Sequence, residues 1–352
     1  MLSVVPPEEA TAPLAVPSSA ALGRRALGLV VLLVVLALVV SVLPGLGDVR
    51  ERFSQAEPWW IVVTLASSFA SRLSYVAALR GSLSRQIDWR PAWNLGMAEQ
   101  GSNVLLPTGG VGGPALGAIV LRRAGVPTGV AAPRSAALFL LTSLTSFTAI
   151  AVAGVLTGIG LLPADVPWFG TLLPAALAVG LVTAIAALGH LPVGQRSQNE
   201  RRARRWARQG AALLRDGVQE SRTLLRVHDP LVIGGCIGYL ALDIAALGAA
   251  FQAFGGGGPP FGAFVLAYAL GQVGSLIPTP GGLGGTEGGL IAMLVVYGAP
   301  AAPAAAAVLA YRVFQLGLPA ILGVLAFRQI RRRLADTEQT AEVAARFDAN
   351  SP

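Results

Sequence analysis

Long apolar runs recur along this chain and restrict the folds that it can adopt. They cover residues 26–43, 61–79, 135–160, 169–190, 231–254 and 303–327. Each reaches the ~18–20 residues with which a helix crosses a bilayer. Of the 352 residues, 54% are hydrophobic and only 12% are charged, whereas a typical soluble domain carries about 25% charged residues. The sequence therefore predicts an all-α polytopic integral membrane protein with about six full spans.

The first apolar run, 26–43, follows Arg24 and Arg25. A positive segment before an apolar one fits either a cleaved signal peptide or an uncleaved first span. We favour the uncleaved span, because the apolar run is long and further spans follow it. Residues 1–23, which are rich in Pro, Ala and Ser, are predicted to be a disordered N-terminus. A transmembrane domain over 24–333 and a polar tail over 334–352 complete the predicted organisation.

The arginines predict how these spans are oriented. The chain has 26 arginines and no lysine. Arginine-rich connections lie at 80–90, 122–134, 194–229 and 328–333, and connections without arginine lie at 161–168, 255–260 and 298–302. The positive-inside rule assigns the arginine-rich connections to the cytoplasm. The predicted location is the inner (plasma) membrane, in a multi-pass arrangement with cytoplasmic N- and C-termini.

Two apolar segments, 92–121 and 261–297, are interrupted by Pro and Gly. Proline breaks a helix, and glycine accepts backbone angles that other residues avoid. Within hydrocarbon, irregular backbone is tolerated only where it is buried in protein or lines a polar cavity. Each segment is therefore predicted to be a re-entrant helical hairpin. On the layout above, 92–121 enters from the cytoplasmic side and 261–297 from the opposite side.

The two interrupted segments also resemble each other. Leu106-Pro-Thr-Gly-Gly-Val-Gly-Gly113 parallels Ile277-Pro-Thr-Pro-Gly-Gly-Leu-Gly-Gly285, with one extra proline in the second copy. Related segments of opposite orientation indicate an inverted repeat, which places a substrate site near the bilayer midplane. The alternative is chance recurrence in a chain with 43 glycines and 24 prolines.

Four charged residues fall within the predicted membrane segments: Arg72, Asp243, Glu287 and Arg312. An intramembrane charge is expensive and faces a cavity or a partner. We hypothesise that Arg72 or Arg312 binds a lipid phosphate, because arginine offers forked donors. Glu287 is then a counter-ion or a proton-coupling carboxylate; the alternative is a structural Glu287–Arg312 ion pair. For Asp243, helix packing or a hydrogen bond to a neighbouring Ser or Thr is favoured over substrate contact.

The glycine-rich turns add candidates for the same cavity. Backbone N–H groups and helix N-termini attract anions, which makes the turns at Gly109, Gly110, Thr279, Gly281 and Gly282 candidate phosphate contacts. Further polar side chains within the hairpins are interpreted as hydrogen-bond partners for backbone groups that the helix breaks leave unpaired, and they are also expected to face the cavity. These secondary candidates are Glu99, Gln100, Asn103 and Gln272.

The basic stretch Arg196–Arg226 alternates arginines with apolar residues such as Trp206 and Leu213. It is predicted to be an amphipathic helix on the inner leaflet. Its role is interpreted as a topology anchor, with recruitment of anionic lipid as the alternative.

The motif Pro278–Glu287, followed by Tyr297-Gly298 and Tyr311-Arg312, resembles the lysylphosphatidylglycerol synthase transmembrane-region family over roughly residues 22–333. That family includes the flippase-type membrane domain of bacterial multiple peptide resistance factors. The resemblance implies an integral membrane domain that translocates or otherwise handles anionic or polyprenyl-linked lipids. Because the sequence ends shortly after the last apolar run, the aminoacyltransferase domain of larger members is not expected.

The predicted function is therefore that of a lipid transporter of the flippase type, with membrane lipids as partners and no nucleic acid. The alternatives are a membrane enzyme that modifies a lipid head group, with Glu287 as base, and a non-transporting partner in cell-envelope synthesis. Signatures of an enzyme are few, because a chain without lysine has no Walker-type phosphate loop. His190 and His228 lack metal-ligand spacing. No cofactor, metal or catalytic residue is assigned.

Overall fold

The computed structural model describes residues 21, 23–25, 27–28, 47–124, 126, 128–163, 166–188, 202–277 and 279–349. Within these ranges the chain is helical and forms no strand. The elements are α2 (Gly47–Ser54), α3 (Pro58–Ser82), α4 (Trp89–Leu105), α5 (Gly112–Arg123), α6 (Thr128–Gly158), α7 (Trp168–Leu188), α8 (Arg202–Val227), α9 (Pro230–Ala253), α10 (Phe261–Gly271), the 3₁₀ turns η1 (Gln272–Leu276) and η2 (Pro280–Gly282), α11 (Gly285–Val296) and α12 (Ala301–Ala349).

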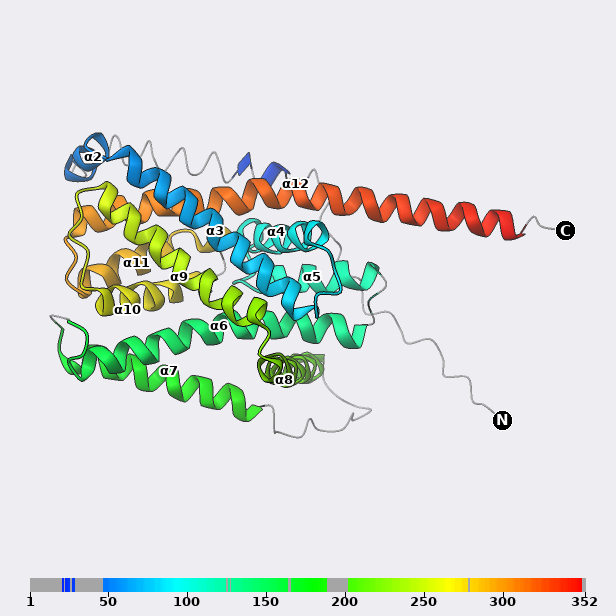
Figure 1. The fold of residues 1–352 in the computed structure, drawn as a ribbon, viewed down its shortest axis with the longest axis horizontal. Coiled ribbons are helices and arrows are strands. Elements are labelled where there is room, and N and C mark those ends of the chain that lie inside the picture. Colours follow the sequence, from blue (N-terminus) through cyan, green and yellow to red (C-terminus); the bar gives the residue numbers. More distant parts are fainter. Residues whose placement is uncertain are drawn as a thin grey trace.

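Five of the described helices are long and apolar enough to cross a membrane. They comprise α3, most of α6, α7, α9 and the segment Ala301–Arg333 of α12. These helices run lengthwise through the molecule (Figure 1). They coincide with five of the six predicted spans, and the prediction of an all-α polytopic membrane protein is confirmed. The remaining predicted span, 26–43, lies outside the described residues except for positions 27 and 28, and the predicted N-terminal segment up to residue 20 also lies outside them.

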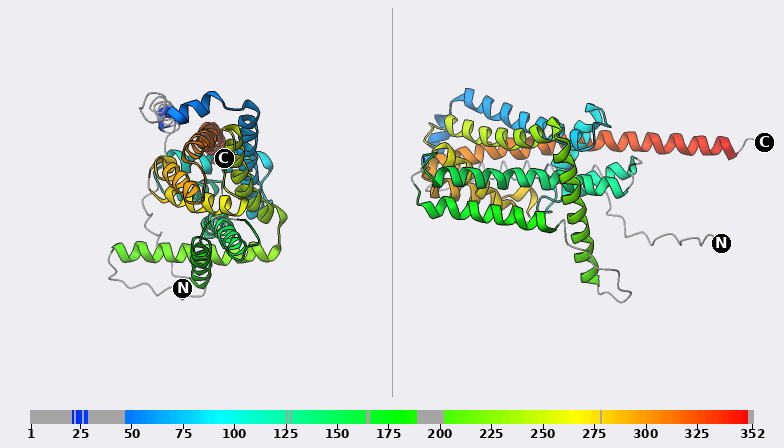
Figure 2. Two further views of the ribbon diagram at one scale, coloured as in Figure 1. Left: turned by 90° about the vertical axis from the view of Figure 1, so that its left-hand side faces the viewer. Right: turned by 60° about the horizontal axis from the view of Figure 1, so that its bottom comes forward.

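Helix α8 has a different direction from the spans. It is seen end-on in Figure 1 and runs across the bundle in Figure 2. Gly217 lets it approach α6, because an added Cβ there would lie 3.0 Å from the Cβ of Ala136. Arg222 donates to the carbonyl of Ala186 at the end of α7, 2.9 Å away. The basic segment is therefore a crosswise helix at one end of the bundle, which is the geometry expected of an interfacial helix.

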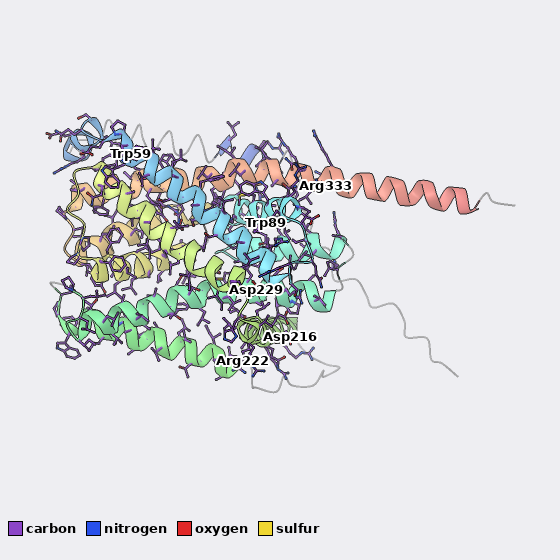
Figure 3. All side chains as sticks on the ribbon, viewed as in Figure 1. Trp59, Trp89, Asp216, Arg222, Asp229 and Arg333 are labelled. Carbon is purple, nitrogen blue, oxygen red and sulfur yellow. The ribbon has the colours of Figure 1, made fainter. Side chains whose placement is uncertain are left out.

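Charged side chains gather at the end of the bundle where α8 lies. Figure 3 labels Asp216, Arg222, Asp229 and Arg333 in this half, whereas Trp59 lies at the opposite end. Asp229 caps α9 by accepting from the backbone N–H of Leu231 at 2.8 Å. The arginine-rich connections thus share one end of the molecule, as their spacing along the sequence predicted.

Asp229 also joins two connections at this end. It pairs with Arg85 at 3.0 Å. The hydrogen bond from Arg85 lowers the pKa of the Asp229 carboxyl, and the same bond raises the pKa of the Arg85 guanidinium. The pair links the turn after α3 to the start of α9.

Both Gly/Pro motifs interrupt their helices. In the first, Leu106 is extended, with φ −111° and ψ 135°, as the residue before a proline prefers. Gly109 and Gly110 follow at φ +59° and +87°, angles that glycine adopts without a Cβ penalty. In the second motif, Gly281 and Gly284 have φ of +62° and +82°. Each predicted hairpin is therefore two short helices joined by an irregular turn.

The two helical arms of each hairpin run in opposite directions and pack closely against each other. In the first, Gly113 of α5 faces Asn103 of α4, where an added Cβ would lie 2.7 Å from Nδ2. In the second, a Cβ on Gly274 would lie only 1.9 Å from the carbonyl oxygen of Gly285. Small residues at such crossings allow helix backbones to approach in a membrane.

The hairpins extend from opposite ends of the bundle toward each other. In Figure 1, α4 and α5 lie toward the end that carries α8, and α10 and α11 lie toward the other end. Their tips meet in the middle. A Cβ on Gly109 would lie 3.7 Å from the carbonyl oxygen of Leu276, and one on Gly281 would lie 3.4 Å from that of Val104. The two motifs that the sequence singled out are therefore neighbours in space.

Candidate functional site

A cavity of about 200 Å³ lies where the hairpin tips meet. Residues from α3, α4, α9, α12 and both turns line it, namely Arg72, Gln100, Asn103, Val104, Gly109, Gly110, Tyr239, Gln272, Ser275, Thr279, Gly281, Gly282, Arg312, Gln315 and Leu316. Most of these side chains are polar, although α3, α9 and α12 are long and apolar enough to cross a membrane. Because polar surface inside a membrane protein marks a functional site, we treat this cavity as the candidate site.

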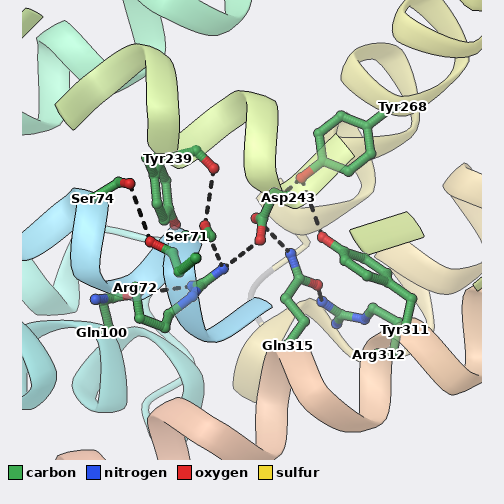
Figure 4. Close-up of polar contacts among 11 residues, drawn as sticks. Ser71, Arg72, Ser74, Gln100, Tyr239, Asp243, Tyr268, Tyr311, Arg312 and Gln315 are labelled. Carbon is green, nitrogen blue, oxygen red and sulfur yellow. Dashed lines mark hydrogen bonds and ion pairs between the residues drawn. The ribbon is translucent and has the colours of Figure 1, made fainter. Parts of the chain in front are cut away.

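Arg72 enters the cavity wall from the middle of α3 and is only 4% exposed. Its Nη2 lies 2.6 Å from Oδ1 of Asp243, and its Nη1 donates to Oε1 of Gln100 at 2.8 Å. The guanidinium lies over the ring of Tyr239, 5.0 Å from the centroid, in a cation–π contact. Figure 4 shows these partners converging on Arg72 from two helices, α4 and α9. The arginine is therefore held in one orientation.

Asp243 connects Arg72 to the second hairpin. Its Oδ2 accepts from the hydroxyl of Tyr268 at 3.2 Å and from Nε2 of Gln315 at 3.4 Å. The hydroxyl of Tyr268 lies 3.2 Å from that of Tyr311. Of the two roles weighed for Asp243, it has the packing role, because the crossing of α3 and α9 brings a cation to it; the hydrogen bonds described for its side chain come from Arg72, Tyr268 and Gln315 rather than from Ser or Thr.

Arg312 and Glu287 form the second ion pair of the site, with Nε and Oε1 2.7 Å apart. Nη2 of Arg312 donates to the carbonyl of Gly281 at 2.6 Å. The second carboxylate oxygen of Glu287 accepts from the backbone N–H of Gly284 at 2.7 Å, which caps α11. The pairing that the sequence allowed is present, and it fixes the irregular turn to α12.

Gln315 joins the two ion pairs into one network. Its Oε1 accepts from Nη1 of Arg312, and its Nε2 donates to Asp243, as Figure 4 shows. The network holds two guanidinium groups and two carboxylates, so the formal charges balance. This balance lowers the cost of burying charge in a medium of low dielectric constant.

Two buried atoms of the cavity wall have no hydrogen-bond partner within the described chain: Nε of Arg72 and Nε2 of Gln100. Both are donors. Buried polar groups in proteins are nearly always paired. Two residues that line the cavity therefore each hold a buried donor for which the described residues supply no acceptor.

The glycine turns line the cavity, but several of their N–H groups are already used. The N–H of Gly112 donates to Oγ1 of Thr108 at 3.0 Å, and that of Gly113 donates to Oδ1 of Asn103 at 2.6 Å. Oγ1 of Thr279 donates to the carbonyl of Leu283 at 2.9 Å. Asn103 and Thr279 thus stabilise their own turns, as the sequence suggested for Asn103.

The structure brings most of the predicted site residues to one place. Ten of them line the cavity: Arg72, Gln100, Asn103, Gly109, Gly110, Gln272, Thr279, Gly281, Gly282 and Arg312. Asp243 and Glu287 contact the two arginines directly. Glu99 does not line the cavity; it points in another direction from α4, where it accepts from the hydroxyl of Tyr75 at 2.8 Å.

Sequence reasoning missed Tyr239, Tyr268, Tyr311 and Gln315 as members of the site. A helical signal was available for two of them. Gln315 lies three residues after Arg312 and Tyr239 lies four residues before Asp243, spacings that place side chains on one helix face. Tyr268 had no such signal, because it belongs to a helix without a charged residue.

The fold and site can be compared with known proteins. No curated protein is significantly similar to this chain in sequence. Residues 25–323 match the family model for the lysylphosphatidylglycerol synthase TM region. This range includes both interrupted hairpins and both buried ion pairs. The resemblance seen in the motif Pro278–Glu287 is thereby confirmed, and the chain belongs to the lysylphosphatidylglycerol synthase transmembrane-region family.

Proposed function

We propose that this protein is a lipid transporter of the flippase type, and that the cavity between the hairpin tips binds the phosphate of an anionic or polyprenyl-linked lipid. Family membership supports a role in handling membrane lipids. The proposed location is the inner membrane, with the arginine-rich end and both termini in the cytoplasm.

The observation that carries the proposal is the pair of unpartnered donors at Arg72 Nε and Gln100 Nε2. A phosphate oxygen is a strong acceptor, and arginine binds phosphate well through its several N–H groups. Arg312 lines the same cavity, so a bound phosphate would lie between two guanidinium groups. The carboxylates of Asp243 and Glu287 keep those cations paired when no lipid is present.

The arrangement of the hairpins supports movement of a lipid across the bilayer. Two segments of similar sequence extend from opposite ends and meet at the cavity. In transporters built from inverted repeats, the substrate site lies at the meeting point of broken helices and opens alternately to each side. We interpret the two hairpins as such a repeat, with the turns at Gly109 and Gly281 as the moving parts.

A membrane enzyme that uses Glu287 as a base is less well supported. Both carboxylate oxygens of Glu287 are engaged, one by Arg312 and one by the N–H of Gly284. A general base must lie within hydrogen-bond reach of the proton that it removes, whereas both oxygens of Glu287 face donors of the protein itself.

Proteoliposomes that contain labelled phosphatidylglycerol or a labelled polyprenyl phosphate test the proposal. Wild-type protein should move the label between leaflets, and Arg72→Gln and Arg312→Gln should remove most of that activity. Arg85→Gln is the control, because Arg85 forms an exposed ion pair far from the cavity. Each variant must first give a monodisperse profile in detergent. If both cavity variants move the label as fast as the wild type does, the assignment is overturned.

A further inference from the structure

Glu99 is the one predicted site residue that the cavity leaves unexplained. It lies on α4 and is only 1% exposed. Its Oε2 accepts from the hydroxyl of Tyr75 on α3 at 2.8 Å. Its Oε1 is buried and has no hydrogen-bond partner among the described residues. A fully buried carboxyl group therefore has half of its polar surface unsatisfied.

The space around this carboxyl group is occupied by α5 and α6. A Cβ on Gly117 of α5 would lie 1.7 Å from Oε1 of Glu99 and 3.3 Å from Oγ of Ser135 on α6. Oγ of Ser135 is likewise buried without a partner in the described chain. Two unsatisfied oxygens thus face the same glycine, and only glycine leaves room for the carboxyl group there.

No described cation forms an ion pair with Glu99. Arg72, on the neighbouring helix, is engaged by Asp243 and Gln100. The titratable group in contact with Glu99 is the Tyr75 hydroxyl from α3, and the ring of Tyr239 from α9 packs behind it, with centroids 5.4 Å apart. At this point α5 contributes Gly117 and α6 contributes Ser135, and neither residue carries a charge. An ionised carboxylate in such a place would be uncompensated, at a cost of several kcal/mol.

We propose that Glu99 is a proton-binding site, and that the packing of α4 against α5 and α6 is that of the protonated form. A neutral carboxyl group fits this closed packing. When Glu99 releases the proton to water, its charge needs solvent or a cation, and the contact at Gly117 must loosen. Because α4 also carries the cavity residues Gln100 and Asn103, proton release would move the first hairpin tip.

Coupling of lipid movement to a proton follows from this site and depends on the function proposed above. One proton binds as the carboxylate becomes a carboxylic acid, and the same proton leaves when the hairpin opens. Proton binding itself does not depend on the transport proposal. The two parts are therefore tested separately.

The first experiment measures thermal unfolding of the purified full chain in detergent between about pH 6 and about pH 9. Glu99→Gln imitates the protonated acid. Wild-type stability should fall as the pH rises, because ionisation is opposed by burial in the folded state, and Glu99→Gln should lose this dependence. Glu57→Gln, at an exposed position, should keep the wild-type dependence. An unchanged pH dependence in Glu99→Gln would overturn the proposal.

Infrared difference spectroscopy provides a second measurement if Glu99→Gln folds poorly. The carbonyl band of a protonated carboxyl group should shift in Tyr75→Phe, which removes only the hydrogen bond to Oε2. A spectrum of Tyr75→Phe identical to that of wild type would contradict a protonated Glu99.

The second experiment uses proteoliposomes with and without a proton gradient. Wild-type lipid transport should be several-fold faster with the gradient, and Glu99→Gln should transport at the same rate in both conditions. A gradient response that survives in Glu99→Gln would overturn the coupling. If the wild type moves no lipid, the transport proposal fails, while the pH dependence of unfolding still decides whether Glu99 binds a proton.

Discussion

The guanidinium of Arg72 lies 2.6 Å from the carboxylate of Asp243, although the two residues are 171 positions apart in the chain. The contact ties α3 to α9, and the hydrogen bond from Arg72 to Gln100 adds the first hairpin. On the other side, Tyr268 and Gln315 connect Asp243 to the second hairpin and to α12. This pair is therefore a structural centre of the bundle, and its arginine lines the cavity.

Loss of one partner of this pair should destabilise the fold strongly. Asp243→Ala leaves the buried guanidinium of Arg72 without an anion, and breaking a buried pair costs about 3–5 kcal/mol. Thermal unfolding in detergent should show a large decrease in stability. The double variant Arg72→Met with Asp243→Leu should recover part of the stability but no lipid transport. A double variant that is no more stable than Asp243→Ala would contradict this interpretation.

The two roles of Glu287 can be separated by substitution. Glu287→Gln retains an oxygen that can accept from the N–H of Gly284, since glutamine also serves at this capping position. It removes the charge that faces Arg312. Glu287→Ala removes both interactions. Thermal unfolding should therefore rank wild type above Glu287→Gln and Glu287→Gln above Glu287→Ala. Equal stability of the two variants would show that the cap contributes nothing.

Close packing of the second hairpin should make Gly274 intolerant of substitution. An added Cβ would lie 1.9 Å from the carbonyl oxygen of Gly285, and this backbone atom cannot move without separating the arms. Gly274→Ala should reduce the yield of folded protein and the unfolding temperature. Gly288→Ala is the matched control, because nothing lies within 4 Å of its added Cβ. That control should be neutral or stabilising by about 0.5–1 kcal/mol. Equal behaviour of the two variants would refute the packing argument.

Acid should weaken the contact between Asp229 and Arg85. The hydrogen bond from Arg85 lowers the pKa of Asp229, so the folded state favours the ionised carboxyl. The resulting stability is present above the unfolded-state pKa of about 3.9 and is lost as the pH falls through the lower folded-state pKa. Asp229→Asn keeps an effective helix cap but cannot ionise.

The test compares thermal unfolding of wild type and Asp229→Asn from about pH 6 to about pH 3. The wild type should lose more stability than the variant over this range, and the difference should be small because Arg85 is exposed. Parallel curves would indicate that the ion pair contributes nothing to the pH dependence.

Part of the candidate site was predictable because charge is rare within a membrane segment and because clustered Gly and Pro interrupt a helix. Arg72, Glu287 and Arg312 stand out in apolar sequence, and all three lie at the junction of the hairpins. Tyr268 does not stand out, because tyrosine is ordinary in an apolar helix. Its role depends on the position of Asp243, which another helix supplies.

Glu99 illustrates the limit more sharply. The sequence grouped it with Gln100 and Asn103 as cavity-facing polar residues. In the structure Gln100 lines the cavity, whereas Glu99 points away from it toward Tyr75. The side chains of adjacent helix residues point in directions that differ by about 100°. Which of the two meets the cavity therefore depends on the helices that pack around α4.

The amino-acid sequence was enough to predict the membrane class, five spans, the two interrupted hairpins and the end of the bundle at which the arginines gather. These features follow from hydropathy and from the local backbone preferences of Gly and Pro, which act over a few residues. The pairing of Arg72 with Asp243 and the link that Gln315 makes between the two ion pairs became visible only in the folded chain. The same holds for Glu99, which forms no ion pair with a cation of the described ranges. Such pairings depend on where distant helices cross, and close packing of the whole bundle fixes those crossings.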